Sequence, residues 1–371
     1  MLFASSGGNK ELNIGLDHQI IYDSTFTYEQ YNYSGPAPLF LTIWFPVKGK
    51  LKGDFISMEK LLHPVVPPQL EQVYSALLNK QLEIVVRDAF KTNISTDEEI
   101  NYPDSVNGKL LHYFSSLTTA SKAGKFKKSS FPVIVYHHGS QGFAAENWEL
   151  CEYFAKRGFI VVSSNFHWSF KDVIFGLFPY HFKRSENYSE VHRMIRWAKE
   201  NGNGDVFFIG HSWGAQQGWC TLHNPGPVKA FVSLETTVEM RTDTSVIKEF
   251  WPLVYESLKT NSNKLPIPVL QFSNTEKDEP FAFFEKSCTS TFVQAGYKTY
   301  FPHNAYTSVF FSRMWMNEQL NNPDQKALLL YHQVYVKHLE MIHQFLLHHK
   351  TTKLDYFGPY ATDFYLHYPN Q

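Results

Sequence analysis

The chain has 371 residues and a net charge of −1 at neutral pH, and 43% of its residues are hydrophobic. The balanced charge gives no overall field that would attract nucleic acid, and no run of about 18 apolar residues indicates a transmembrane segment. The three cysteines, Cys151, Cys220 and Cys288, are too few for a disulfide framework and lack the spacing of a zinc site.

The first ten residues, "MLFASSGGNK", lack the charged and then apolar order of an intact secretory signal. This leaves the localisation unknown and an exported mature form open. Aromatic residues make up 16% of the chain. They fit an aromatic core, and they also fit a pocket that binds an apolar or aromatic ligand.

The first predicted element is a strand over 38–47, rich in aromatic and β-branched residues. A mostly helical segment is expected over 54–100, where apolar residues recur at helical spacing. From residue 131 onward, continuous apolar strands alternate with amphipathic helices. Strands are predicted at 131–139, 159–166, 205–210, 229–235 and 267–274, and helices at 146–158, 185–202, directly after Ser212, and at 323–349. This alternation predicts an α/β fold with a mostly parallel sheet that is covered by helices on both faces.

The stretch "DVFFIGHSWGAQQGWC" (205–220) places Ser212 between two glycines, where a strand ends and a helix begins. A sharp turn of this kind projects a serine above the sheet edge, and the helix N-terminus behind it offers backbone N–H groups to a developing oxyanion. The crowded backbone requires small residues two positions before and after the serine, which Gly210 and Gly214 supply. We therefore expect Ser212 to be a nucleophile.

A serine nucleophile needs a histidine base that is oriented by a carboxylate. In this topology the chain order is serine, acid, histidine, so the base lies late in the sequence. His303 fits, because it opens a loop after a short predicted strand, "YKTYF" (297–301), which breaks at Pro302. Five other late histidines lie in or at the end of the predicted C-terminal helix, where packed or solvated side chains are expected: His332, His338, His343, His348 and His349.

Two acids compete for the third position. Glu235 ends the strand "KAFVSLE", as a rigidly held carboxylate should, whereas Asp278 follows the next strand in the charged segment "TEKDEP". The usual position of the acid in this topology favours Asp278, and the local pattern favours Glu235, so the residues alone leave the choice open. For the oxyanion hole we expect backbone N–H groups of Trp213 and of Ser140, where Gly139 allows close approach of the chain.

These motifs resemble those of the α/β hydrolases. The similarity is strongest to the branch that contains the plasma-type platelet-activating factor acetylhydrolases and bacterial dienelactone-hydrolase-like enzymes. It covers about 36–47 and 131–347 and is carried by "FPVIVYHHGSQGFAAENWELCEYFAKRGFIVVSSNFHW", "GHSWGA", "AFVSLE", "IPVLQFSN" and "PHNAYTS". The resemblance implies a triad acid after the earlier strand, hence Glu235, and Ser140 and Trp213 as oxyanion donors. A glutamate stands where that branch usually has aspartate.

The expected organisation is one α/β-hydrolase domain over 1–371, with insertions at 54–128 and 236–265 that shape the pocket. The expected function is a serine esterase that acts on a small-molecule ester through an acyl-enzyme, with no cofactor and no metal. An acyltransferase and a catalytically silent binding module on the same fold are the alternatives. Fold carries over more readily than substrate does.

Overall fold

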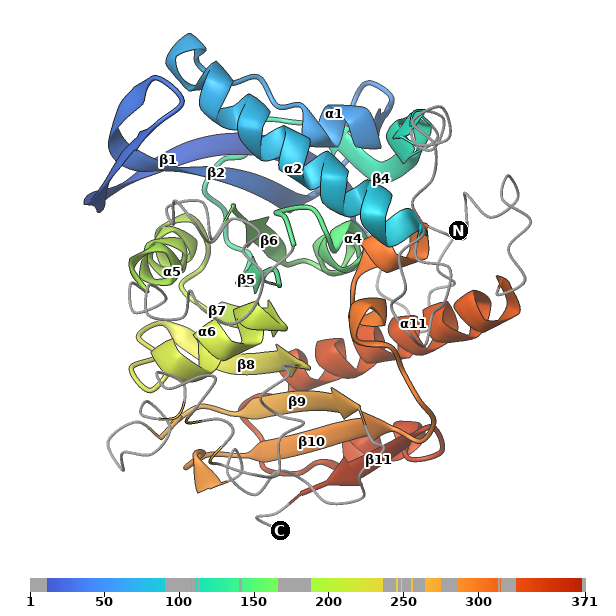
Figure 1. Cartoon of the computed structure of the whole chain (residues 1–371). Helices are drawn as coiled ribbons and strands as arrows, with labels where there is room; N and C mark the ends of the chain where they lie inside the picture. The colour runs from blue at the N-terminus through green and yellow to red at the C-terminus, as the bar shows by residue number, and fades with distance from the viewer. Residues whose placement is uncertain are drawn as a thin grey trace.

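The computed structural model describes residues 12–90, 114–139, 142–165, 188–235, 264–274, 286–312 and 325–368, together with a few single residues between these ranges. One large sheet runs through the molecule, with helices packed along it (Figure 1). Most of the expected insertion at 236–265, the rival acid Asp278 and the expected oxyanion donor Ser140 lie outside the described residues.

The sheet has 11 strands in the order β11-β10-β9-β8-β7-β5-β6-β2-β1-β4-β3. Its strands are β1 (Asn13–Gln30), β2 (Tyr33–Val47), β3 (Phe55–Ser57), β4 (Thr118–Ala123), β5 (Val133–His137), β6 (Ile160–Ser163), β7 (Val206–His211), β8 (Val228–Leu234), β9 (Val269–Asn274), β10 (Phe292–Tyr297) and β11 (Phe364–His367). The strands from β6 through β10 are mutually parallel, whereas β2 pairs antiparallel with β6 and β1 antiparallel with β2. The expected mostly parallel sheet is therefore confirmed.

Within the described residues, the helical elements include α1 (Met58–Leu62), η1 (Pro68–Leu70), α2 (Glu71–Phe90), α4 (Trp148–Lys156), α5 (Ser189–Asn201), α6 (Trp213–Thr221), η4 (His303–Tyr306), α11 (Gln325–Leu347) and η5 (Asp355–Tyr360). The helices expected before and after Ser212 are present, as is the long C-terminal helix. The segment expected to be helical over 54–100 contains α1, η1 and α2, but it opens with the short strand β3.

One strand boundary was predicted wrongly. The strand expected at 297–301 is β10, which runs from Phe292 to Tyr297 and pairs with β9 along that whole length. The aromatic residues within 297–301 produced a strand-like pattern there, whereas Gln294 and Gly296 weakened the apolar pattern of the observed strand. The turn therefore begins earlier, which places a longer connection before His303.

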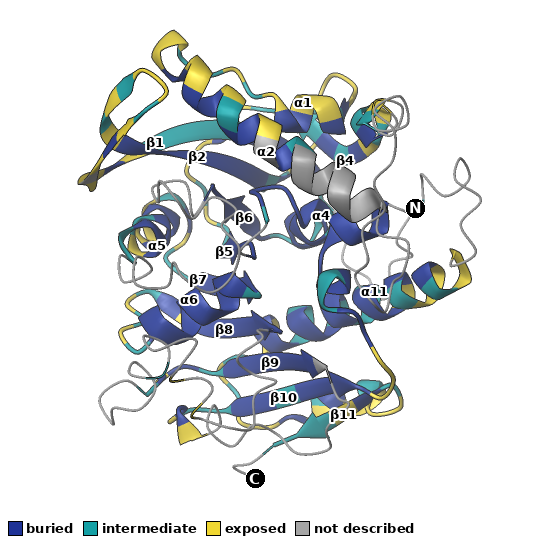
Figure 2. Cartoon of the chain, viewed as in Figure 1, coloured by how far each residue is buried: buried dark blue, intermediate teal, exposed yellow. Residues whose placement is uncertain are grey.

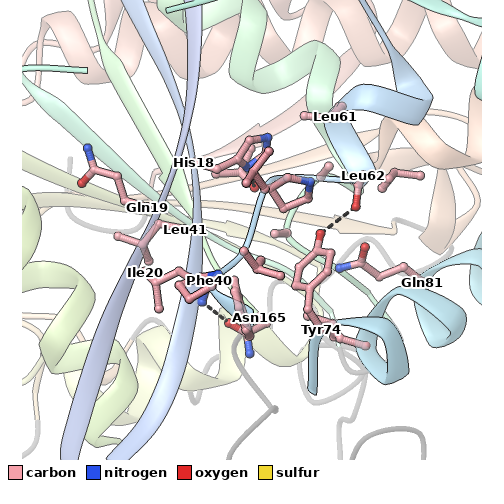
Figure 3. A pocket seen from close by; sticks show the side chains of 18 of the residues that line it. His18, Gln19, Ile20, Phe40, Leu41, Leu61, Leu62, Tyr74, Gln81 and Asn165 are labelled. Atoms are coloured by element: carbon pink, nitrogen blue, oxygen red, sulfur yellow. Dashed lines mark hydrogen bonds between the residues drawn. The ribbon is translucent and has the colours of Figure 1, made fainter. Parts of the chain in front are cut away.

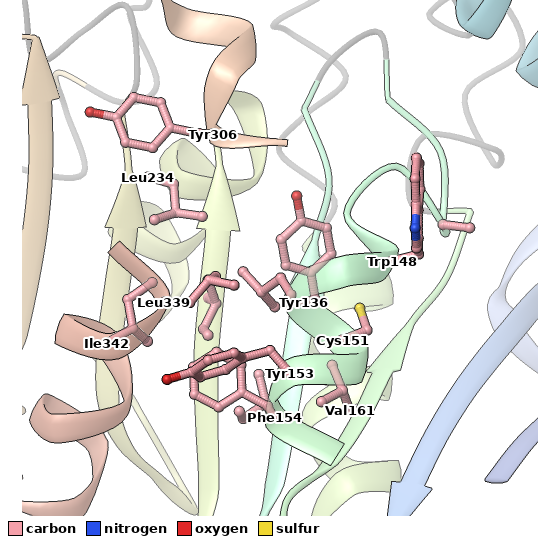
Figure 4. Close-up of a cluster of buried hydrophobic side chains, with 14 of the residues drawn as sticks. Tyr136, Trp148, Cys151, Tyr153, Phe154, Val161, Leu234, Tyr306, Leu339 and Ile342 are labelled. Atoms are coloured by element: carbon pink, nitrogen blue, oxygen red, sulfur yellow. The ribbon is translucent and has the colours of Figure 1, made fainter. Parts of the chain in front are cut away.

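Consecutive residues of the parallel strands are buried (Figure 2). Because successive side chains of a strand point to opposite sides of the sheet, both faces of the sheet are buried here. On one face, α4 and α11 cover a cluster that includes Tyr136, Val161 and Leu234 (Figure 4). On the other face, α5 and α6 contribute to a second cluster with the intervening residues of β5, β6 and β7. The turn at Ser212 thus rests on a sheet that is packed from both sides.

Burial of His338, on α11, has a testable consequence for the stability of the protein. His338 is enclosed by aromatic rings, with the Phe272 and Phe301 ring centres at 4.6 and 4.9 Å, and neither ring nitrogen has a hydrogen-bond partner among the described residues. Burial lowers the pKa of His338 from 6.5 to about 3. The unfolded chain therefore takes up the proton first, and stability falls as the pH drops from about 6.5 towards 3.

We expect His338→Phe to raise the stability at pH 7 and to reduce the loss between pH 7 and pH 4.5 by about 3 kcal/mol, at about 1.4 kcal/mol per pKa unit. Urea unfolding at the two pH values measures both effects. His348→Phe is the control, because His348 follows the end of α11 directly and is exposed. A pH dependence unchanged by His338→Phe would contradict the assignment.

Candidate active site

Ser212 occupies the turn between β7 and α6, with backbone angles of φ 51° and ψ −110°. A positive φ is uncommon for a residue other than glycine, and strain of this kind collects at functional sites. The Ser212 N–H donates to the carbonyl oxygens of both Leu234 and Glu235, each at 3.0 Å. The turn is therefore fastened to the end of β8, and its partly exposed serine stands at the carboxyl edge of the sheet.

The glycines around Ser212 are required by close backbone approach. A Cβ at Gly210 would overlap the backbone of Gly214, and a Cβ at Gly214 would overlap the carbonyl of His137 on β5. Gly139, in the loop after β5, comes so near that its Cβ would lie 3.3 Å from the Cβ of Ser212. The loop expected to supply an oxyanion donor thus lies directly beside the serine.

Glu235 and His303 meet next to this turn. Nδ1 of His303 lies 3.4 Å from Oε2 of Glu235, whose side chain is buried, while the His303 side chain is 30% exposed. Contacts between catalytic groups are often long in ligand-free structures and shorten when substrate binds. Glu235 itself has a φ of 38°, and its N–H donates to the carbonyl oxygen of Phe272 at 3.1 Å. Ser212 and Glu235 thus both have a positive φ, and they follow the ends of the neighbouring strands β7 and β8.

The five competing histidines of the C-terminal segment have other surroundings. His332 lies 2.9 Å from the carboxylate of Glu149, and His338 is enclosed by aromatic rings. The rest pack against aromatic side chains: His343 on Tyr153, Phe154 and Phe159, His348 on Tyr356, and His349 on Phe207. Each of the five therefore has a structural setting within the helix packing.

A second buried pair of a carboxylate and an imidazole adjoins the first. Oε1 of Glu146 accepts hydrogen bonds from the Tyr136 hydroxyl at 2.7 Å and from the Gly139 N–H at 3.2 Å, and it lies 3.4 Å from Nδ1 of His211. Burial alone would raise the pKa of the Glu146 carboxyl, but the hydrogen bond and charge of His211, with smaller contributions from other neighbours, hold it below its usual range. Glu146 therefore carries a negative charge beside the turn.

His211 also contacts the loop that carries His303. Its Nε2 lies 3.3 Å from the carbonyl oxygen of His303, and the two rings are tilted at a centroid distance of 4.9 Å. Nδ1 of His211 thus faces the Glu146 carboxylate, and Nε2 faces the His303 carbonyl oxygen. The pair connects the Gly139 loop, the Ser212 turn and the His303 loop.

Asn147 strengthens the same connection from the next position in the chain. Its Nδ2 donates to the carbonyl oxygen of Tyr306 at 2.9 Å, and its Oδ1 accepts from the Tyr335 hydroxyl of α11 at 2.6 Å and from Ser308. The Glu146 carbonyl also accepts the N–H of Val309 at 2.9 Å. The turn at 146–147 therefore holds the loop that carries His303.

Sequence reasoning missed Glu146 and His211. Two signals were present: a histidine in the position before the serine, and a glutamate directly after the apolar run "GFAA" (142–145). Neither belongs to a motif with a mechanism, and 64 intervening residues separate them in the chain. Their meeting depends on β5 and β7 being neighbours in the sheet.

The remaining site predictions have these outcomes. Trp213 is the first residue of α6 and is buried. Among the described residues, no group of three His, Cys, Asp or Glu side chains could hold a metal ion, and no helix is long and apolar enough to cross a membrane. The three cysteines are buried and form no disulfide with one another.

Comparison with known proteins identifies the fold. No protein family model matches this chain, and no curated protein sequence matches it. Among solved structures, the chain is similar to a ferulic acid esterase from Streptomyces cinnamoneus, with a TM-score of 0.50 and 14% identity over 86% of this chain and 82% of that chain. The chain has the α/β-hydrolase fold.

A putative dienelactone hydrolase from Klebsiella pneumoniae is also similar, with a TM-score of 0.34 and 16% identity over 46% of this chain and 75% of that chain. In this chain the Ser212 turn joins β7 directly to α6 at the carboxyl edge of the sheet. The Ser212 N–H donates to the Glu235 carbonyl oxygen, and the Glu235 side chain faces His303, so the three predicted site residues lie at one edge of the sheet.

Proposed function

We propose that the protein is a serine hydrolase that cleaves a carboxylic ester through an acyl-enzyme intermediate. The observation that carries the proposal is the strained Ser212 turn beside the Glu235–His303 pair. A turn serine without a catalytic role would need neither a left-handed backbone nor a buried carboxylate facing a partly exposed imidazole. The esterase name of the neighbour from Streptomyces cinnamoneus agrees with an ester substrate.

In the proposed reaction, His303 removes the proton of the Ser212 hydroxyl as its oxygen attacks the ester carbonyl carbon. Glu235 orients the imidazole and stabilises its charged form. The backbone N–H of Trp213, with that of Ser140, stabilises the oxyanion. His303 then gives its proton to the leaving alcohol oxygen, the C–O bond breaks, and water hydrolyses the acyl-enzyme with His303 as the base.

The substrate is proposed to be a small ester with an apolar or aromatic part, and the mechanism requires neither a metal nor an organic cofactor. Reaction of intact protein with a fluorophosphonate tests the nucleophile, because the probe bonds covalently to an activated serine. Product analysis with added alcohols then separates hydrolysis from acyl transfer, since an acyltransferase would form the new ester in preference to the free acid.

A further inference from the structure

A cavity of about 320 Å³ lies between the sheet and the helices of the 54–128 segment (Figure 3). Side chains of β1 and β2, such as Ile20 and Phe40, line one side, and Tyr74, Leu77 and Gln81 of α2 line the other. Its volume is at the lower end of the range of ligand pockets and equals roughly ten water molecules in the liquid. A moderately sized organic group fits this space.

Three polar atoms at the cavity lack partners among the described residues. They are Nε2 of His18, Oε1 of Gln81 and Nδ2 of Asn165. The side chains of Gln81 and Asn165 are buried, and that of His18 is half-buried. Leaving such atoms unsatisfied costs free energy, so a bound group with a hydroxyl or carbonyl would relieve part of that cost. Asn165 is fixed in place, because its Oδ1 accepts the N–H of Phe40 at 2.7 Å.

The cavity favours an uncharged ligand. None of the described residues that line it is acidic, lysine or arginine, and burial lowers the pKa of His18 to about 4, which keeps its ring neutral at neutral pH. An ion transferred into this space would lose its hydration without gaining a counter-charge. The matching chemistry is an apolar chain or ring that carries a neutral hydrogen-bonding group.

From the Ser212 turn, the cavity lies in the direction of β6 and β2. Asn165 follows the end of β6, and only β5 separates β6 from β7, which carries Ser212. With strands about 4.8 Å apart, the ends of β6 and β7 lie roughly 10 Å apart. Ala144 and Ala145, which also line it, belong to the same loop as Gly139.

The direction of the substrate follows from the position of the base. His303 contacts Glu235 at the end of β8, on the opposite side of β7 from the cavity. The leaving alcohol must lie beside His303, because that side chain protonates the alcohol oxygen. The acyl part of the ester therefore extends away from His303, towards β6 and the cavity.

We infer that this cavity binds the far end of the substrate's acyl group, and that the preferred substrates are esters of uncharged, medium-length acids with a neutral polar group near the end. The inference rests on the proposed ester hydrolysis and specifies its substrate class. An acetyl group is too short to reach the cavity, whereas eight carbons joined by bonds of about 1.5 Å reach roughly this far.

The test measures kcat/KM for the p-nitrophenyl esters of acetic, octanoic and 8-hydroxyoctanoic acids. Leu77→Trp, which fills the cavity from α2, is expected to lower kcat/KM at least tenfold for the two longer esters and to change it less than twofold for the acetate. Asn79→Trp is the matched control, because Asn79 is exposed on the same helix. An octanoate-to-acetate ratio unaltered in Leu77→Trp would overturn the inference while leaving ester hydrolysis intact.

Two further measurements keep the outcomes separate. Gln81→Leu, nearly the same in shape, is expected to lower the preference for the 8-hydroxyoctanoate over the octanoate about threefold to tenfold; an unchanged preference counts against the polar role of Gln81. Calorimetric titration of methyl 8-hydroxyoctanoate into Ser212→Ala measures binding without turnover, and Leu77→Trp in that background is expected to abolish it. Binding lost in this way without esterase activity in the parent protein would support the cavity and refute the proposed reaction.

Discussion

Replacing Glu235 with glutamine is expected to lower kcat by about four orders of magnitude, with little change in KM. The Glu235 carboxylate faces Nδ1 of His303 at 3.4 Å and is fully buried. A glutamine amide of the same shape donates a hydrogen bond to Nδ1 and so favours the imidazole tautomer that cannot accept the serine proton. The corresponding change in serine proteases has an effect of this size.

Asp278→Asn is the matched control, since Asp278 is the other acid that the sequence leaves open. We expect it to change kcat by less than threefold. Turnover of p-nitrophenyl acetate measures both variants, with Ser212→Ala as the background and thermal unfolding as the check on folding. A large loss in Asp278→Asn together with a small one in Glu235→Gln would assign the acid to Asp278.

Replacing Glu146 with glutamine is expected to lower the free energy of unfolding by about 2 kcal/mol, because the neutral amide weakens the buried hydrogen bonds that the carboxylate accepts from Tyr136 and Gly139. The same change is expected to lower kcat about 10- to 100-fold, since displacement of a catalytic group by about 1 Å has an effect of that order. Glu146 acts as a positioning residue, through His211 and the Gly139 N–H. KM should change little.

Tyr136→Phe distinguishes the effect of the Glu146 charge from the effect of losing one buried hydrogen bond. It removes one hydrogen bond to the same Oε1 atom but leaves the Glu146–His211 pair, so we expect a stability loss of about 1 kcal/mol and a kcat within threefold of the parent. Kinetics are measured well below the unfolding temperature of each variant. Equal kcat values in Glu146→Gln and Tyr136→Phe would show that Glu146 serves stability alone.

The central part of the fold could be predicted because buried parallel strands are nearly continuous apolar runs. The stretches that contain β5, β6, β7, β8 and β9 are of this kind, and each prediction lies on the observed strand. The 18-residue strand β1 was missed, because its segment mixes Asp17, His18, Gln19 and Asp23 with apolar residues. Its stability comes from pairing with β2, a contact that the local pattern does not encode.

The residues of the candidate site also differ in whether a local sequence pattern or a long-range contact distinguishes them. Ser212 could be proposed from the sequence because strand, turn and helix are all local, and His303 because chain order and a proline break limited the choice. Glu146 could not be found, since its importance depends on which strands are neighbours and on a contact with His211 at 3.4 Å. The cavity beside α2 likewise depends on how a segment from 54–128 folds back over β1 and β2.

The most direct measurement is mass-spectrometric mapping of the residue that a fluorophosphonate probe modifies on the intact protein. We predict one adduct, on Ser212 within the 205–220 stretch, formed at a rate that octanoate esters slow by competition. Ser212→Ala should remain unmodified, and Glu235→Gln should react far more slowly. An unmodified Ser212 in folded protein, or an adduct that persists in Ser212→Ala, would contradict the proposed mechanism.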